Sequence, residues 1–488
     1  MSYEIWFITG SQHLYGPETL EQVNAHSREI AAYLDAHEYV PAKVVFQPVV
    51  TTPEEILDLC RRANSAPQCV GVITWMHTFS PSKMWIAGLL ALQKPLLHWN
   101  TQYNRDIPWD SIDMDFMNLN QSAHGDREHG FIHARLRTRR KVVAGHWQDE
   151  DTLRRIDAWA RSAVGASESR GLKIARFGDN MREVAVTEGD KVEAQIRLGW
   201  SINGYGLGDL TERLRAVSAA DVEQKLQAYA AAYDMDTQNL EAVRVQAAIE
   251  AALEGFLREG GFGGFTTTFE NLAGLQQLPG LAVQNLMAAG YGFGAEGDWK
   301  LAGLTRVLKR MARGLSGGTS FMEDYTYHLE KGNELVLGAH MLEVCPSIAA
   351  ARPRVQVHPL GIGGKADPAR LVFDGSSGPA TLTTLVDLGD RFRMIVNDVE
   401  AVTPPHAMPR LPVARVMWKP LPGLTAASEA WILSGGAHHS VLSYGLTAEH
   451  LRSLADILGV EFVHIHRGTD VDDLADRLRL GDAVWKLK

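Results

Sequence analysis

The sequence predicts an α/β protein with two Rossmann-like (flavodoxin-like) parallel-sheet domains, followed by a β-rich, antiparallel, barrel-like C-terminal domain. Three observations support this prediction. At 488 residues the chain is too long for one compact core, and about three domains are expected. Short apolar runs alternate with amphipathic stretches in the first two thirds, whereas short alternating runs separated by turns dominate the last third. We expect domains at residues 1–171, 172–315 and 316–488.

The first hundred residues alternate between strand and helix periodicity. Apolar runs predict strands at 3–9, 44–49, 70–75 and 95–99. Helices are expected between them, at 17–37, from residue 52 onward, and at about 82–92. Residues 52–55, Thr-Pro-Glu-Glu, form a capping box with proline at the first helical position, which marks a helix start. Ligands of parallel sheets usually bind beyond the carboxyl ends of the strands, which draws attention to residues 10–16.

The rest of the chain divides into an irregular stretch, a second α/β unit and the β-rich part. Residues 101–147 are irregular, an acidic helix is expected at about 150–164, and 165–169 is predicted to be a linker. The second α/β unit has strands at 172–177 and 262–269 and helices near 219–233, 237–258 and 281–289. Strands of the β-rich part are expected at 325–329, 335–340, 370–373, 380–387 and 391–396. A helix at about 448–458 and a short basic tail close the chain.

Charge and cysteine content narrow the class of protein. The net charge of −10 argues against nucleic acid as a main partner, and the basic run at 137–141 is interpreted as solvated surface. No secretory signal pattern and no membrane-spanning apolar run are present. Three cysteines, Cys60, Cys69 and Cys345, have no metal-knuckle spacing and fit a reducing compartment. We therefore expect a cytoplasmic protein that does not bind membranes.

A glycine-rich loop presents the first candidate catalytic residue. Residues 292–297, Gly-Phe-Gly-Ala-Glu-Gly, formally match the spaced glycines of a dinucleotide-binding loop. The sequence places the loop after a helix, and Glu296 stands where a pyrophosphate would approach, which is unfavourable on Coulomb grounds. No cofactor-binding residue is therefore predicted. The loop is either an ordinary solvent-facing turn or a tight turn that presents Glu296 to a site.

Three further candidates each have an ordinary structural explanation as well. Glu323 follows a glycine turn, His340 ends an apolar run with Glu343 three residues later, and His438-His439 follows another apolar run. Adjacent histidines in a strand point to opposite sides, so at most one of the pair should face a shared site. Other histidines compete on composition alone: His77, His98, His124, His129, His133 and His146.

Glu296, Glu323, His340 and His439 together form a chemically sensible set. Two carboxylates and two imidazoles make a mixed oxygen–nitrogen ligand set of intermediate hardness. Such a set suits Mn²⁺, Co²⁺ or Mg²⁺ with open octahedral positions better than a closed structural zinc site. Spacing alone does not show that the four side chains converge.

Five stretches closely resemble the L-arabinose isomerase family. They include Gly10-Ser11-Gln12-His13-Leu14-Tyr15-Gly16 and Phe321-Met322-Glu323-Asp324-Tyr325. The others lie at 109–121, 297–300 and 435–439, and all occur in order with similar spacing up to about residue 450. Asn100 departs from the histidine that is typical before Thr-Gln, which bears on substrate preference rather than on the class of reaction.

The resemblance implies a metal-dependent aldose–ketose isomerase of pentose catabolism. Such an enzyme converts L-arabinose to L-ribulose through a cis-enediol, acts on D-galactose as well, uses Mn²⁺ with Co²⁺ or Mg²⁺ as substitutes, and forms a homohexamer with sites at subunit interfaces. The family's catalytic, metal-binding glutamates match Glu296 and Glu323, and its metal-binding histidines match His340 and His439. Residues that line the sugar pocket match Gln12, Leu14, Tyr15, His124, Met181, Phe269 and Ile362.

Three alternatives stay open at this point. A metal-assisted hydride shift would use the same four residues without a solvent-exchanging enediol, and the order of the two glutamates is unresolved. An NAD(P)-linked oxidoreductase would use the glycine loop. A non-catalytic sugar-binding protein would share the two α/β lobes, but it explains neither the β-rich last third nor the missing export signal.

Overall fold

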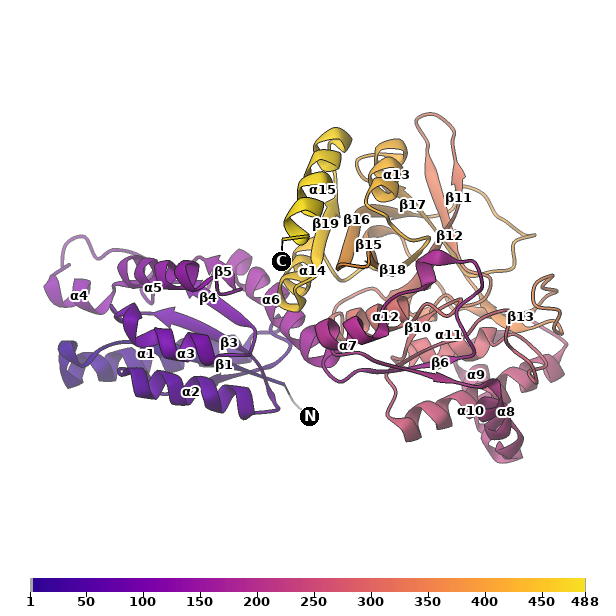
Figure 1. Ribbon diagram of the computed structural model, residues 1–488, viewed down its shortest axis with the longest axis horizontal. Helices are drawn as coiled ribbons and strands as arrows, with labels where there is room; N and C mark the ends of the chain where they lie inside the picture. The colour runs from indigo at the N-terminus through magenta and orange to yellow at the C-terminus, as the bar shows by residue number, and fades with distance from the viewer. Residues whose placement is uncertain (1–2, 488) are drawn as a thin grey trace. The chain divides into compact units, whose positions relative to one another are not determined.

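The computed structural model describes residues 3–487, which form two compact units (Figure 1). The N-terminal unit comprises the chain up to Ser167 together with residues 452–457. The second unit comprises residues 168–451 and the chain from Leu458 onward. The second unit contains both a parallel sheet and the antiparallel barrel, so the predicted division near residue 315 stays a prediction.

The N-terminal unit is built on a five-stranded parallel sheet, sheet A. Its strands are β1 (Glu4–Gly10), β2 (Lys43–Phe46), β3 (Cys69–Met76), β4 (Leu96–Asn100) and β5 (Lys141–Ala144), in the order β2-β1-β3-β4-β5. Its helices include α1 (Gly16–Ala36), α2 (Pro53–Ser65), α3 (Ile86–Ala91) and α6 (Glu150–Ser169). The strand order is that of flavodoxin-like folds, and the capping box at Thr52 is present. All eight residues of β3 are buried, as expected for a sheet covered on both faces.

Two sequence-based expectations for this unit are wrong. The stretch at 101–147, expected to be irregular, contains α4 (Met114–Leu119), α5 (Ser122–Leu136) and strand β5. Two glycines and three histidines within α5 weaken its apolar periodicity, which hides the helix in the sequence. The predicted linker at 165–169 is the last turn of α6, where Ala166 packs into the interior.

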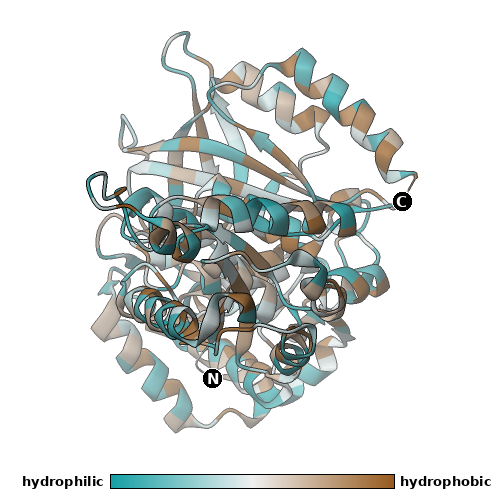
Figure 2. Cartoon of the chain, turned by 90° about the vertical axis from the view of Figure 1, so that its left-hand side faces the viewer, coloured by the Kyte–Doolittle hydropathy of each residue, from teal (hydrophilic) through white to brown (hydrophobic). Residues whose placement is uncertain are grey.

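The second unit begins with a four-stranded parallel sheet, sheet B. Its strands are β6 (Lys173–Phe177), β7 (Ser201–Tyr205), β9 (Gly264–Thr266) and β10 (Gly292–Gly294), in the order β10-β9-β6-β7. Its helices are α7 (Lys191–Leu198), α8 (Leu207–Ala216), α9 (Ala219–Ala232), α10 (Leu240–Gly260), α11 (Gly280–Ala288) and α12 (Trp299–Met311). The helices in the foreground of Figure 2, which belong to the N-terminal unit, carry hydrophobic and hydrophilic residues side by side along their length, as expected for helices that cover a sheet.

The rest of the second unit is a closed antiparallel barrel of six strands. They are β11 (Thr319–His328), β12 (Leu335–Ala339), β15 (Gly378–Asp387), β16 (Phe392–Val402), β17 (Arg415–Pro420) and β18 (His439–Ser443). The order is β15-β18-β11-β12-β17-β16, and pairing of β15 with β16 closes the circle. Strand β19 (Glu461–Ile465) adds to β16 in parallel. A small sheet of β8 (Asp234–Met235), β13 (Arg354–Val357) and β14 (Ala369–Val372) packs beside it. The predicted fold class is confirmed.

The end of the chain differs from the expectation in two places. Residues 430–433, the apolar run that precedes the histidine doublet, form the last turn of helix α13 (Leu424–Leu433) and not a strand leading into the doublet. The expected basic tail is instead the helix α15 (Val471–Trp485), which follows α14 (Ala448–Leu458) and β19. Short apolar runs do not distinguish a buried strand from part of a helix, which explains the first error.

Candidate active site

Three neighbouring strands of the barrel carry three of the four predicted residues. Glu323 in β11 pairs on one side with His439, the first residue of β18. On its other side it pairs with Ala339, the last residue of β12, and His340 follows directly. Side chains at paired positions of adjacent antiparallel strands lie on one face, about 5 Å apart. Closure of the barrel therefore brings together residues that are far apart in the sequence.

Glu296 reaches the site from a strained turn between β10 and α12. Its backbone φ is 59°, in the left-handed region that costs a non-glycine residue about 1–3 kcal/mol. The turn is held by hydrogen bonds: the Met181 N–H donates to Glu296 O (2.9 Å), and the Gly297 N–H donates to Thr267 O (3.0 Å). A Cβ on Gly297 would lie 2.5 Å from the Cα of Asn180, so only glycine permits this approach. Such strain is typical of functional sites.

The four predicted side chains converge. Glu296, His340 and His439 each offer a ligand atom within 4.8 Å of the other two. Glu296 Oε2 lies 3.9 Å from His439 Nε2, and Glu323 Oε2 lies 3.7 Å from His340 Nε2. The two histidine side chains are 0% and 2% exposed, and the two glutamates 14% and 19%. The histidines are therefore buried beneath carboxylates that a solute can reach.

Each buried histidine is oriented by a carboxylate behind it. His439 Nδ1 lies 3.2 Å from Asp298 Oδ2, and His340 Nδ1 lies 2.5 Å from Glu343 Oε2. An N–H on Nδ1 that donates to a carboxylate leaves the Nε2 lone pair free to accept. The Nε2 atom of His439 is buried and has no hydrogen-bond partner, and a carboxylate–histidine arrangement of this kind orients metal-ligating histidines in proteins.

The charges of the site favour the ionised form of Glu296. Burial alone would raise the pKa of Glu296, but the hydrogen bond with His438 and the nearby histidines lower it below its usual value. Burial would lower the pKa of His340, but Glu343, Glu323 and Glu296 together raise it. Burial lowers the pKa of His439 despite the opposing effect of Asp298, so its neutral form is favoured. A neutral imidazole and ionised carboxylates are the forms that bind a cation.

His438 lies closer to the site than the sequence indicated. Both histidines of the doublet approach Glu296, with His438 Nε2 at 3.5 Å and His439 Nε2 at 3.9 Å from Oε2. The expectation that only one would face a shared site is wrong, because β18 begins at His439 and strand alternation does not extend to His438. A second candidate ligand group is Glu323, His438 and His439. His438 is 36% exposed and is held by Glu296, whereas His439 is fully buried with a free Nε2.

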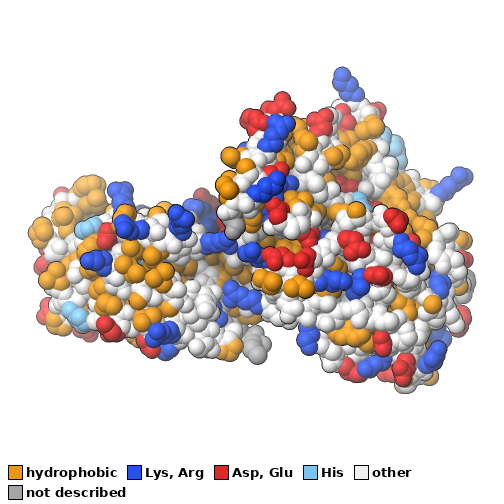
Figure 3. All heavy atoms as spheres, in the orientation of Figure 1, with side chains coloured by type: hydrophobic (Ala, Val, Ile, Leu, Met, Phe, Trp, Pro, Cys, Tyr) orange, Lys and Arg blue, Asp and Glu red, His pale blue; other side chains and the backbone are white. Residues whose placement is uncertain are grey.

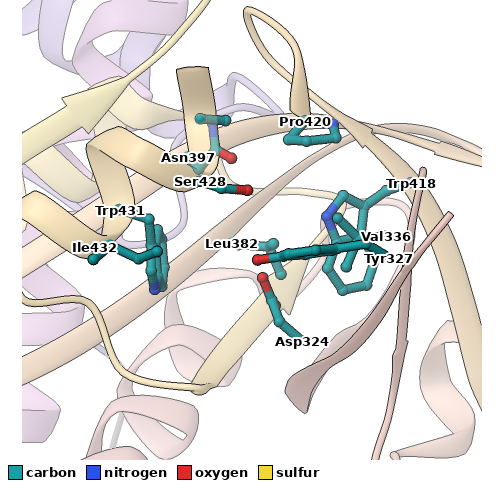
Figure 4. A pocket seen from close by; sticks show the side chains of 11 residues that line it. Asp324, Tyr327, Val336, Leu382, Asn397, Trp418, Pro420, Ser428, Trp431 and Ile432 are labelled. Atoms are coloured by element: carbon teal, nitrogen blue, oxygen red, sulfur yellow. The ribbon is translucent and has the colours of Figure 1, made fainter. Parts of the chain in front are cut away.

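Asp324 faces away from its neighbour Glu323. It lines a different pocket at the end of the barrel together with Tyr327, Trp418, Trp431 and others, and its side chain points into that pocket (Figure 4). Burial and the charge of Glu323 raise the pKa of Asp324 to about 7. The pocket has a volume of ≈ 30 Å³, which is room for water rather than for a sugar.

The structure corrects the sequence argument about the glycine loop. Residues 292–294 form strand β10 and α12 follows, so the loop does lie between a strand and a helix. Its glycines nevertheless serve internal packing: a Cβ would lie 2.0 Å from Ala302 O at Gly292 and 2.2 Å from Asp298 O at Gly294. These glycines allow α12 to pack against the strand and present Glu296, which is the second of the two interpretations considered above.

Two of the predicted sugar-pocket residues border the four-residue cluster. Met181 is bonded through its backbone to Glu296, and the ring of Phe269 stacks on His340 at 6.1 Å between centroids. Ile362 is 38% exposed in a turn whose Gly363 packs near Phe269 O. These three residues belong to the second unit.

The other four predicted sugar-pocket residues belong to the N-terminal unit. Gln12, Leu14 and Tyr15 follow β1 at the carboxyl end of sheet A, and Leu14 is 82% exposed. Tyr15 Oη donates to Gln121 Oε1 (3.4 Å), next to the start of α5, where His124 stacks on Phe79. The four therefore gather at one edge of the sheet, where ligands of such folds bind.

Four residues with a role in this geometry were not predicted: Asp298, Phe321, Glu343 and His438. Phe321 lies two residues before Glu323 on β11 and packs edge-on against the rings of both His340 and His439. The i, i+2 spacing on a strand was the available signal for Phe321. Asp298 caps α12, and helix-capping by itself explains an aspartate there.

The competing histidines form clusters of another kind. His98, His129 and His133 are buried together in the N-terminal unit, with Nε2 of His129 and His133 3.0 Å apart. His77 bonds His26, and His146 lies 3.4 Å from Tyr103 O. Across residues 3–487, Glu296, Glu323 and their three histidines make up both of the groups with metal-ligand spacing.

Surface charge and helix composition bear on whether the protein could bind a charged polymer or cross a membrane. Lys and Arg side chains are interspersed with Asp and Glu on the face shown in Figure 3. Among the described helices, none combines the length and apolar character that crossing a bilayer requires.

Comparison with known proteins matches the whole chain. Models of the L-arabinose isomerase N-terminal, central and C-terminal domains match residues 1–171, 173–314 and 318–461. L-arabinose isomerases of Anoxybacillus flavithermus and Geobacillus stearothermophilus are 62% and 61% identical over 492 and 490 residues. That of Thermotoga maritima is 58% identical over 487 residues. The alignments cover 99–100% of this chain and 98% of each relative.

Fold, site and comparisons define the class of protein as an enzyme, and within enzymes as a sugar isomerase. The chain belongs to the L-arabinose isomerase family.

Proposed function

We propose that the protein isomerises L-arabinose to L-ribulose in pentose catabolism, with Glu296 and Glu323 as catalytic residues and a divalent cation held with His340 and His439. One observation carries the proposal: two carboxylates and two carboxylate-oriented histidines converge at the barrel end. Ligand atoms of Glu296, His340 and His439 lie within 4.8 Å of one another, and Glu323 Oε2 lies 3.7 Å from His340 Nε2. The relatives named above support the choice of substrate.

The donor set fits a divalent cation. His439 Nε2 is a buried atom without a partner, and two ionisable carboxylates stand beside it. Mixed carboxylate and imidazole ligands suit Mn²⁺, with Co²⁺ or Mg²⁺ as substitutes. When bound, the ion would polarise the two oxygens of the reacting sugar carbons and stabilise the negative charge that develops there.

The two glutamates provide the proton transfers. Moving a proton between C2 and C1 requires a base that removes a C–H proton and a group that shuttles a proton between the two oxygens, which passes through a cis-enediol. The lowered pKa of Glu296 favours its ionised form, which can accept a proton. Glu323 lies beside His340. Glu296 and Glu323 each lie beside one of the two buried histidines, so the two roles are assigned to the pair.

The same site should accept D-galactose and form D-tagatose. D-galactose differs from L-arabinose in a larger substituent at C5, away from the reacting carbons. Ile362 and Met181, which line the sugar pocket in this proposal, are then the residues that set the preference between the two sugars.

The assembly is proposed to be a homohexamer with sites where subunits meet. The segment before α5 exposes large apolar side chains, with Trp109 79%, Met114 64% and Met117 53% exposed. Exposed apolar clusters of this kind mark interaction surfaces. Gln12, Leu14, Tyr15 and His124 would complete the sugar pocket from a neighbouring subunit. Light scattering on the purified protein measures the subunit number, and a monomer would contradict this part of the proposal.

An aldose panel with added metals tests the activity. We expect ketose from L-arabinose and, more slowly, from D-galactose, with EDTA abolishing activity and Mn²⁺ restoring it. Full activity in verified metal-free protein would reject the metal. Reaction in tritiated water separates the enediol from a hydride shift, because only the enediol exchanges with solvent. Sugar binding without ketose formation would identify a binding protein, and an absorbance change at the nicotinamide band would identify an oxidoreductase.

The cytoplasmic location stays a prediction. Cys60, Cys69 and Cys345 are unpaired and buried, as in proteins of reducing compartments.

A further inference from the structure

One lysine is buried directly behind the candidate active site. Lys300 lies in the first turn of α12, and its side chain is 1% exposed. Its ammonium group donates to Thr187 O (2.9 Å) and Glu188 O (2.6 Å) and lies 3.4 Å from Asp298 Oδ1. Three acceptors match the three N–H bonds of an ammonium group. A fully buried lysine is rare unless it is paired in this way.

The contact with Asp298 leads to His439. Asp298 uses its two oxygens for different partners: Oδ1 accepts from the Leu301 N–H (3.3 Å) and faces Lys300, while Oδ2 lies 3.2 Å from His439 Nδ1. The Asp298 side chain is 0% exposed, so solvent does not compensate its charge. The ammonium group of Lys300, 3.4 Å from Asp298 Oδ1, faces that charge.

The other two contacts lead to Glu296. Thr187 O accepts from the Asn180 side chain as well as from Lys300 (2.7 Å and 2.9 Å). The same Asn180 amide also donates to Gly297 O (3.2 Å), next to Glu296. Lys300 therefore holds one end of the loop at 178–190, whose other end is bonded to the strained turn that presents Glu296.

We propose that Lys300 is a positioning residue of the isomerase site: its buried ammonium group holds Asp298 against His439 and holds the 178–190 loop against the Glu296 turn. One side chain thereby fixes the positions of both the Glu296 carboxylate and the His439 imidazole, although it contacts neither of them. This inference rests on the proposed metal-assisted isomerase function.

The test compares Lys300→Met with the unaltered protein and with Lys225→Met. Methionine has a similar length and no charge. Lys225 is a matched control because it also pairs with carboxylates, Glu250 and Glu254 (both 2.6 Å), on helices α9 and α10 of the same unit. Mn²⁺ affinity is measured by titration calorimetry, well below the unfolding midpoint of each variant, and kcat and KM for L-arabinose are measured at saturating Mn²⁺.

The expected result for Lys300→Met is a Mn²⁺ affinity weakened about 10–100-fold, the usual effect of losing a group behind a metal ligand, together with a lower kcat. Lys225→Met should lose stability but keep its Mn²⁺ affinity and kcat. An unchanged affinity and kcat in folded Lys300→Met would overturn the proposal, because a purely structural lysine would behave like the control.

A double variant decides the case in which Lys300→Met does not fold. Asp298→Asn combined with Lys300→Met removes both buried charges and leaves none unpaired. Both residues act on His439, so the double variant should lose less Mn²⁺ affinity than the product of the losses in the two single variants. Where Lys300→Met does not fold, the Mn²⁺ affinity of the double variant should be no more than about tenfold weaker than that of Asp298→Asn. The proposal would be overturned if the affinity loss of the double variant equals or exceeds the product of the two single losses, or exceeds the tenfold limit. It would also be overturned if the double variant fails to fold.

Failure of the metal proposal would be recognised separately. If the unaltered protein binds no Mn²⁺ yet isomerises L-arabinose, the metal role is wrong. The comparison of kcat values then decides whether Lys300 is a positioning residue. A lower kcat in Lys300→Met than in Lys225→Met would then support positioning, and equal values would reject it.

Discussion

Two clusters of buried histidines lie in different units of the chain and differ in their partners. His340 and His439 each have a carboxylate behind the ring and a second carboxylate in front of it. His129 and His133 instead face each other on α5, beside His98, and burial with neighbouring positive groups lowers their pKa, to about 3 for His133. We propose that the first pair binds a cation, whereas burial favours the neutral form of the second pair.

The difference shows that histidine content does not identify a site. His129 and His133 have the i, i+4 spacing on a helix that is common in metal sites, whereas His340 and His439 are far apart in the sequence. The carboxylates decide the chemistry, because an imidazole with an acid on Nδ1 is oriented and remains free to bind at Nε2. In the second cluster His98 has a carboxylate partner, Asp126, but this contact is made at Nε2, at 2.9 Å.

Removing the front carboxylates should have the largest effect. We expect Glu296→Gln and Glu323→Gln each to lower kcat for L-arabinose about 10²–10⁴-fold, because each loses a proton-transfer group. Steady-state assays at saturating Mn²⁺ measure the effect, with circular dichroism and subunit number unchanged. Glu330→Gln, at an exposed site after β11, is the control and should be fully active. Near-normal turnover in either glutamine variant would reject the assignment.

Exchanging histidines in the two clusters should separate binding from stability. His340→Gln and His439→Gln are expected to weaken Mn²⁺ binding by at least about 10²-fold, since each removes a ligand atom. His129→Gln should leave the Mn²⁺ affinity unchanged and lower the free energy of unfolding by about 1–3 kcal/mol through a disturbed buried hydrogen bond. Calorimetric titration and thermal unfolding measure the two quantities. Equal losses of affinity in both clusters would contradict the comparison.

Neutralising the acid behind His340 should have a smaller effect. Glu343→Gln keeps the size of the side chain but removes the charge that lies 2.5 Å from His340 Nδ1. We expect a Mn²⁺ affinity about 10–100-fold weaker, with the protein folded. Mn²⁺ titration followed by electron paramagnetic resonance measures it. An affinity within twofold of the unaltered protein would show that Glu343 does not orient the ligand.

Acid should destabilise the N-terminal unit, which contains two buried histidines of strongly lowered pKa, His77, and His133 of the second cluster. Unfolding raises the pKa of His77 and His133 from about 3 to about 6.5, so the unfolded chain binds more protons in this interval. Stability of the N-terminal unit should therefore fall as the pH falls from about 6.5 toward 3, by about 1.4 kcal/mol per pH unit for each histidine. His133→Gln removes one titrating group and should reduce the slope of the unfolding midpoint against pH. An unchanged slope would contradict the assignment to this cluster.

Local patterns predicted most of the elements that frame the site. Alternation of apolar runs and helices predicted the parallel sheets, the capping box at Thr52 predicted the start of α2, and β11, β12, β15 and β16 followed from period-two patterns. Errors arose where apolar periodicity is weak, as in α5, or where a short apolar run has no preference of its own, as at the end of α13.

The fold class, the four candidate side chains and the family resemblance could be predicted from the chain, because periodicity, residue chemistry and motifs are properties of the chain. The folded structure was needed to show that these four side chains converge, that His438 joins them, and that Asp298, Glu343 and Lys300 stand behind them. Convergence depends on the register of β18, β11 and β12 and on closure of the barrel, which are set by long-range pairing. No local stretch of sequence contains that information.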